Sequence, residues 1–260
     1  MHRIVYAFCI SFFIALGANA DTLSSIKEAK KLSVCIWPEY YGISYVEPRT
    51  QTLIGLDVDL AKALAHDLNV DISFVQSSFA TLITDLTSHK CDIAMFAIGH
   101  TPERAQHLQL TQPHLASDIY AITTKSNPRI QTWDDIDQKG VIVAVAKGTL
   151  HVKIMQERLK HATLRIVESM HAREQEVEAG RADVFMADYP FGMRMIAQRE
   201  WAKLIRPTRP FHISPYGWAL RQNEPEWLST VEAFIVAIKN DGRLERFAQK
   251  HGLEPIVILK

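Results

Sequence analysis

Short apolar runs alternate with amphipathic stretches along the chain, and this alternation begins a second time near the middle. The strands expected in the first unit are 32–37, 71–76 and 92–98. The strands expected in the second unit are 141–146, 163–168 and 182–188. Helical patterns separate the strands in both units, which is typical of parallel sheets covered by helices. The sequence therefore predicts an α/β fold of two lobes, each a sheet flanked by helices.

The two lobes are expected to be joined by two crossing strands. A strand at 118–125 leads from the first unit into the second, and the Pro-rich stretch 207–217 reads as the return crossing. The predicted domains are residues 21–117 for the first part of lobe one, 118–212 for lobe two, and 213–260 for the return to lobe one. Because ligands gather at the carboxyl ends of strands in open α/β sheets, we expect a binding cleft between the lobes.

The first twenty residues read as a segment that is removed before folding. A basic start is followed by the apolar run "IVYAFCISFFIAL" and by the small residues "ANA" before Asp21. This pattern predicts a signal peptide over residues 1–20 and export to the periplasm. A membrane anchor is the alternative, although the run is short for a spanning helix.

The charge balance argues against a nucleic-acid partner. The chain has 29 Lys and Arg against 29 Asp and Glu, and the basic residues are scattered. Such a sequence has no basic patch of the kind that binds phosphate backbones. Export makes a disulfide between Cys35 and Cys91 chemically feasible, but two cysteines do not define a framework, so their pairing stays open.

The stretch "HTPERAQ" contains an arginine in an unfavourable place. Thr101 reads as a helix N-cap and Pro102 as the first helical residue, which puts Arg104 in the first turn. A cation there is disfavoured by roughly 0.3–1 kcal/mol because the helix dipole is positive at that end. A bound anion would satisfy both the helix end and the arginine.

Several stretches resemble periplasmic amino-acid-binding proteins that serve ABC importers, the solute-binding proteins of family 3. The matching segments are "GLDVDLAKALAHDL", "DIAMFAIGHTPERAQHLQLTQPH", "VAVAKGT", "GRADVFMADYP", "PYGWALR" and "IKNDGRLERFAQKHG". They span essentially the whole chain after residue 20. The resemblance implies a type II periplasmic binding fold that closes on its ligand by a hinge motion. It also implies a monomer that delivers its ligand to a membrane permease.

The resemblance assigns the two ends of an amino acid to opposite lobes. Arg104 stands where the family binds the ligand's α-carboxylate, and Asp188 where it binds the α-ammonium. The alternatives are a surface arginine paired to a nearby acid or to solvent for Arg104, and a helix cap or an interlobe salt bridge for Asp188. If both assignments hold, closure depends on the ligand because each lobe supplies one contact.

Further ligand contacts follow from the same resemblance. Tyr40 and Phe79 match positions where rings stack on the ligand, Gly148 and Thr149 lie on a turn that donates backbone N–H groups, and His151 lies where a polar contact sometimes occurs. The chain departs from the usual polar residues at five cleft positions, namely Trp37, Phe96, Ala97, Gly99 and Leu150. The expected pocket is therefore unusually apolar, which favours an apolar or aromatic amino acid or another small carboxylate over a strongly cationic ligand.

Three other functions remain alternatives. Cyclohexadienyl dehydratases share this fold, and their pattern has a glutamate three residues beyond the aspartate that matches Asp188. This chain has Phe191 at that position, so we expect no catalysis. Metal transport is the second alternative, because His100, His107 and His114 recur every seven residues. They cannot share one helix face, so we expect neither a metal nor a cofactor. A protein that senses a ligand for a membrane receptor would have the same pocket as one that feeds an importer.

Overall fold

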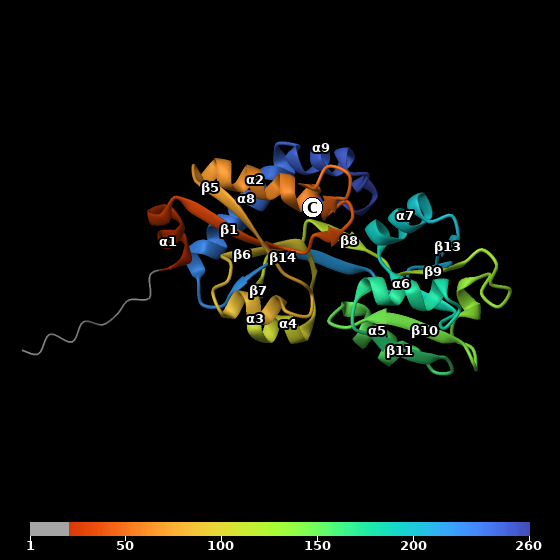
Figure 1. The fold of residues 1–260 in the computed structure, drawn as a ribbon. Helices are drawn as coiled ribbons and strands as arrows, with labels where there is room; N and C mark the ends of the chain where they lie inside the picture. Colours follow the sequence, from red (N-terminus) through yellow and green to blue (C-terminus); the bar gives the residue numbers. More distant parts are fainter. Residues whose placement is uncertain (1–20) are drawn as a thin grey trace, which may run out of the picture.

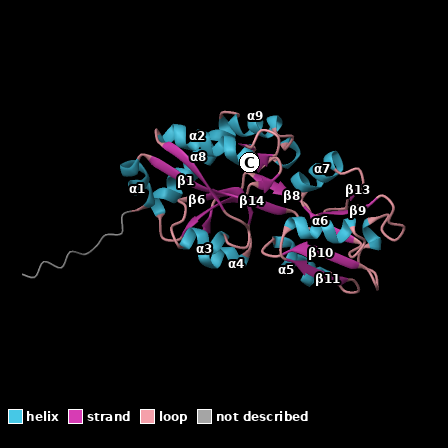
Figure 2. Ribbon diagram, in the orientation of Figure 1, coloured by secondary structure: helices cyan, strands magenta, loops and turns pink. Residues whose placement is uncertain are grey.

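The computed structural model describes residues 21–260, and the expected signal peptide, residues 1–20, lies outside them. The described chain forms two lobes side by side (Figure 1), each with strands at its centre and helices around them (Figure 2). Within residues 21–260 no helix combines the length and the apolar character that crossing a membrane requires.

The sheet of lobe one has six strands. They are β1 (Lys31–Ile36), β5 (Asp71–Gln76), β6 (Ile93–Gly99), β7 (Leu108–Leu110), β8 (Leu115–Ser117) and β14 (Ser214–Arg221). The order is β5-β1-β6-β14-β7, with β8 also paired to β14. β1 is parallel to β5 and β6, whereas β14 runs antiparallel to its neighbours. The carboxyl ends of β1 and β6 therefore meet at one edge of the sheet, where the chain turns toward the other lobe.

Six helices surround this sheet. They are α1 (Thr22–Ala29), α2 (Leu56–Leu68), α3 (Leu82–Thr87), α4 (Pro102–His107), α8 (Pro225–Asn240) and α9 (Arg243–Lys250). In Figure 1, α2, α8 and α9 lie on one side of the strands, and α3 and α4 on the other. α2 buries Leu60, Ala61 and Leu64 and ends at Asn69 in the left-handed conformation. α3 begins only at Leu82, because Ser78 and Thr81 bond to each other and form a turn before it.

Lobe two is built on a five-stranded sheet. Its strands are β9 (Tyr120–Thr124), β10 (Ile142–Ala146), β11 (Thr163–Val167), β12 (Val184–Ala187) and β13 (Ala202–Ile205), in the order β11-β10-β12-β9-β13. Its helices are α5 (Leu150–Arg158), α6 (Met170–Glu178) and α7 (Tyr189–Gln198), with a short 3₁₀ turn, η1 (Trp133–Asp135). β10 runs parallel to β11 and β12, so the ends of β10 and β12 also meet at one edge.

A small third sheet was not expected from the sequence. It consists of β2 (Glu39–Tyr40), β3 (Ser44–Glu47) and β4 (Thr52–Ile54), inserted between β1 and α2. Strands of two to four residues are too short to show a periodic pattern. This sheet holds Tyr40, a residue of the site described below.

The two crossings between the lobes lie against each other. β8 leads through Asp118 into β9, and the return segment leads into β14, where Ser117 pairs with Ser214. The Asp118 carboxylate accepts hydrogen bonds from the backbone N–H groups of Phe211 at 3.0 Å and His212 at 2.8 Å. One side chain on the first crossing thus binds the backbone of the second.

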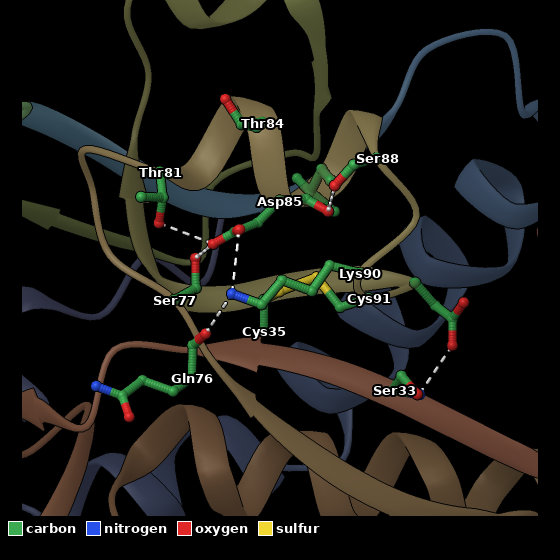
Figure 3. The surroundings of a disulfide bond; sticks show 12 residues. Ser33, Cys35, Gln76, Ser77, Thr81, Thr84, Asp85, Ser88, Lys90 and Cys91 are labelled. Atoms are coloured by element: carbon green, nitrogen blue, oxygen red, sulfur yellow. Dashed lines mark hydrogen bonds and ion pairs between the residues drawn. A yellow bond between two sulfur atoms is a disulfide. The ribbon is translucent and has the colours of Figure 1, made fainter.

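A disulfide joins two neighbouring strands of lobe one. Cys35 in β1 is bonded to Cys91, which stands just before β6 (Figure 3). Both cysteines are buried, and the bond closes a loop over a sequence separation of 56 residues. The pairing that the sequence left open is therefore present in the structure.

Candidate ligand-binding site

A small cavity lies between the lobes, at the edges where the strands of both sheets end. Lobe one lines it with Tyr40, Phe79, Ala97, Arg104 and Tyr216. Lobe two lines it with Thr149, Leu150, His151, Met170, Arg173, Asp188 and Phe191.

Arg104 enters the cavity from the start of α4. As the sequence predicts, Thr101 caps this helix, because its hydroxyl accepts a hydrogen bond from the Arg104 N–H at 3.2 Å. The guanidinium donates to the carbonyl of Gly99 at 2.7 Å and to that of Gly148, on the other lobe, at 3.2 Å. Burial lowers the pKa of Arg104 to about 10, so the side chain stays charged at neutral pH. Neither lobe, within residues 21–260, places a carboxylate within ion-pair distance of it.

Asp188 enters the cavity from lobe two as the N-cap of α7. One carboxylate oxygen accepts a hydrogen bond from the Phe191 N–H at 3.2 Å. The other accepts from the Tyr40 hydroxyl and, at 3.3 Å, from the Tyr216 hydroxyl. Burial raises the pKa of the Asp188 carboxyl, against the lowering effect of these hydrogen bonds. Asp188 is thus a helix cap and an interlobe contact in addition to facing the cavity.

Four aromatic rings predicted for the site form one cluster, but only two of them line the cavity. The ring centroids of Trp37 and Tyr40 are 5.2 Å apart, and Phe79 lies 5.4 Å from Trp37 and 5.2 Å from Phe96. Tyr40 and Phe79 line the cavity, whereas Trp37 and Phe96 are buried behind them. Trp37 and Phe96 therefore fix the cavity wall without forming its surface.

Two backbone N–H groups close to the Arg104 side chain are bound within the protein, those of Ala97 and of Arg104 itself. Ala97 lines the cavity, but its N–H donates at 2.7 Å to the buried carboxylate of Asp57. Gly99 lies behind Arg104 and presents its carbonyl, not its N–H, to the guanidinium. α4 has six residues, and one of its first N–H groups is bound by Thr101. The Ala97 N–H is therefore not free to bind an anion in this arrangement, and the contribution of the helix end stays a prediction.

The turn at the start of α5 brings three predicted residues together. Thr149, Leu150 and His151 line the cavity, and Gly148 contacts Arg104 through its carbonyl. The Thr149 hydroxyl donates to the carbonyl of Ala146 at 2.7 Å, so that donor is used within the turn. Burial, followed by the charges of Arg173 and Arg104, lowers the pKa of His151 to about 3, and the ring is therefore neutral at pH 7.

Four lining residues were not expected from the sequence, namely Met170, Arg173, Phe191 and Tyr216. The sequence does contain an indication that Arg173 is buried. It lies on the same face of α6 as Val177, four residues later, and an arginine at such an apolar position needs a buried partner.

The three histidines weighed for a metal do not form a cluster. His114 is buried against the Trp218 ring, with centroids 4.7 Å apart, and its Nε2 lies 3.4 Å from the Asp57 carboxylate. In the part of the chain that the structure describes, no three His, Cys, Asp or Glu residues are placed to hold a metal ion.

Residues 32–254 match the family described as bacterial extracellular solute-binding proteins, family 3. The chain belongs to this family. The resemblance seen in the sequence is thereby confirmed, and so is the two-lobed type II binding fold.

Relatives of this solute-binding protein include an enzyme and a transport protein. It is 28% identical to a cyclohexadienyl dehydratase of Pseudomonas aeruginosa, over 84% of each chain. It is 24% identical to the L-cystine-binding protein TcyJ of Escherichia coli K12, over 90% of this chain and 86% of that one. Among solved structures, it is similar to the ancestral amino acid-binding protein AncCDT-1, a precursor of cyclohexadienyl dehydratase, with a TM-score of 0.80 and 29% identity over 88% of this chain and 99% of the other.

Proposed function

We propose that this protein is a periplasmic binding protein that captures an amino acid or a related small carboxylate and delivers it to an ABC importer. The observation that carries the proposal is the pairing of Arg104 from lobe one with Asp188 from lobe two across one buried cavity. A zwitterionic head group would place its carboxylate on Arg104 and its ammonium on Asp188. Relatives named as amino-acid-binding proteins of ABC transporters support this class of ligand.

We infer that the two lobes move as rigid bodies about the paired crossings at β8 and β14. One body consists of residues 21–117 and 213–260, and the other of residues 118–212. Arg104 and Gly148 contact each other across the lobes, and so do Tyr40 and Asp188, so the described arrangement is closed. A ligand that contacts both lobes stabilises this arrangement over an open one. Residues 1–20 act in this proposal as the signal peptide that directs export.

The test is a thermal-shift screen against amino acids and small carboxylates, followed by calorimetry on the hits. A ligand that binds the folded state raises the melting temperature by mass action. Arg104→Ala should weaken binding of a hit by on the order of 2–5 kcal/mol, since it removes one partner of a buried charge pair. Arg49→Ala, at an exposed position of the same lobe, is the matched control and should bind normally. Unchanged affinity in Arg104→Ala would remove the carboxylate assignment.

Catalysis is not part of this proposal, although one relative is a dehydratase. At the position three residues beyond Asp188, this chain has Phe191, whose ring packs against the Arg173 guanidinium at 4.4 Å and cannot transfer a proton. The check is an assay of ring-acid dehydration with prephenate and with arogenate. Turnover above background by the wild-type protein would replace the binding function with an enzymatic one.

The membrane partner distinguishes a protein that feeds an importer from one that senses a ligand for a receptor. An importer partner should hydrolyse ATP faster in vesicles when the liganded protein is added, whereas a receptor partner should not. We expect the protein itself to be monomeric, which sedimentation measurements check.

A further inference from the structure

Arg173 is a second buried cation at the cavity, on the opposite lobe from Arg104. It projects from α6, the helix labelled at the centre of lobe two in Figure 1, and its side chain is fully buried. The guanidinium lies against the rings of Phe185 and Phe191, 4.6 Å and 4.4 Å from their centroids, which are themselves 6.1 Å apart. Nη1 donates to the carbonyl of Met186 at 2.5 Å.

The remaining nitrogens of Arg173, Nε and Nη2, have no hydrogen-bond partner within residues 21–260. These two nitrogens share one edge of the planar guanidinium. An Nε–Nη2 edge matches the two oxygens of a carboxylate, which it binds through parallel hydrogen bonds. Leaving such donors buried and unpaired is costly, and Arg173 is one of the residues that line the cavity, so a ligand group is the partner that we infer for them.

The nearby carboxylates of the chain do not fill this edge. Glu174 follows Arg173 in the sequence, but its carboxylate lies 3.7 Å from the Arg199 guanidinium. Asp188 is bound by two tyrosine hydroxyls and a backbone N–H. Both act on Arg173 only through their charge, without a hydrogen bond.

His151 adds a further unused donor beside Arg173. Both of its ring nitrogens are buried without a partner in the described part of the chain. A neutral imidazole donates one hydrogen bond and accepts one. The cavity therefore combines two arginines with a single carboxylate, Asp188, among the described residues that line it. A zwitterionic ligand would leave this excess of positive charge uncompensated.

We propose that the ligand carries two carboxylates, one bound by Arg104 and the other by the free edge of Arg173 with His151 beside it. The inference rests on the proposed binding function and narrows its ligand to acidic amino acids and small dicarboxylic acids. A cationic ligand is disfavoured because it would lie beside two buried guanidinium groups.

The experiment compares each acid with its amide of nearly equal shape. Calorimetry on the wild-type protein uses L-glutamate with L-glutamine, L-aspartate with L-asparagine, and succinate with succinamate. At least one acid should bind ten times more tightly than its amide or better. Neutral or cationic amino acids that bind as tightly as every acid would overturn the inference while leaving the proposed function intact. Absence of binding by every amino acid and carboxylate in the screen would overturn both.

A variant series tests whether Arg173 is the cause of the preference. Arg173→Gln keeps a polar side chain but removes the charge and the guanidinium edge. The acid should then bind at least tenfold more weakly, while the amide changes less than threefold. Arg181→Gln is the matched control, since Arg181 is an exposed arginine of the same lobe that pairs with Glu176. An equal loss of affinity for acid and amide would mean that Arg173 only supports the structure of the lobe. If Arg173→Gln does not fold, the comparison of acids with amides on the wild type decides.

Discussion

At the scale of single residues, Asp57 shows how a buried carboxylate shapes the site without touching the cavity. It lies in the first turn of α2 and accepts hydrogen bonds from the Ala97 N–H at 2.7 Å and from the Trp218 indole at 2.9 Å. Ala97 has a φ of 48°, a left-handed conformation that non-glycine residues rarely adopt. The hydrogen bond to Asp57, the first aspartate in "GLDVDLA", stabilises this backbone conformation beside Arg104.

Asp57→Ala should lower the free energy of unfolding by about 2–4 kcal/mol, because two buried donors lose their acceptor. Urea unfolding followed by circular dichroism measures the change. Asp71→Ala, at an exposed position at the start of β5, should change stability by less than about 0.5 kcal/mol. Equal stability of the two variants would contradict the role given to Asp57.

His151 predicts a pH dependence of stability for the closed arrangement that the structure describes. Its pKa is about 3 in the folded state, because it is buried near Arg173 and Arg104, and near 6.5 when unfolded. Between these values the unfolded state binds more protons, so stability falls as the pH drops. From pH 7 to pH 5 this one residue should cost about 2 kcal/mol.

The measurement is urea unfolding of wild type and His151→Leu at pH 7 and pH 5. Groups common to both proteins cancel in the comparison, and the variant should lose about 2 kcal/mol less on acidification. The same loss in both proteins would show that His151 takes up its proton at an ordinary pKa.

At the scale of elements, the disulfide fastens the two strands that carry most of lobe one's share of the site. β1 leads to Trp37 and Tyr40, and β6 contains Ala97 and Gly99. Closing a loop with a separation of 56 residues should stabilise the folded state by about 4 kcal/mol in the chain-entropy model. A reductant should therefore shift the urea midpoint of the wild type downward. The Cys35→Ala, Cys91→Ala double variant should not respond to it, and two free thiols in the native wild type would contradict the bond.

The sequence was informative about elements and less so about contacts between them. Short apolar runs predicted β1, β5, β6, β10, β11 and β12. Of these, β1, β6, β10 and β12 are largely buried, whereas β5 and β11 are partly exposed edge strands. The hydrogen bond between Tyr40 and Asp188 spans 148 residues and depends on the small sheet that had no periodic signal. Arg173 was missed for a related reason, because its partners Phe185, Phe191 and Met186 come from two later elements.

At the scale of the whole molecule, closure brings the backbones of the two lobes into direct contact. Gly148, on lobe two, lies so close to lobe one that an added Cβ would meet the Cα and N of Ala80 at 2.8 Å and the carbonyl carbon of Phe79 at 3.0 Å. Backbone atoms cannot move aside as a flexible side chain can, so a methyl group there would hold the lobes apart. A Gly148→Ala variant would therefore prevent full closure while leaving the side chains of the site unchanged.

Gly148→Ala should weaken ligand binding at least tenfold, because the contacts of Arg104 and Asp188 with one ligand require the closed arrangement. Its matched control is Gly180→Ala. Gly180 has a φ of 69° against 76° for Gly148, so both variants carry the same backbone strain, but an added Cβ at Gly180 meets nothing within 4 Å among the described residues. Calorimetry with a ligand from the screen gives the affinities, and small-angle X-ray scattering gives the compaction on binding. The wild type and Gly180→Ala should become more compact with ligand, whereas Gly148→Ala should not. Full compaction and normal affinity in Gly148→Ala would mean that the lobes do not need this close approach to hold the ligand.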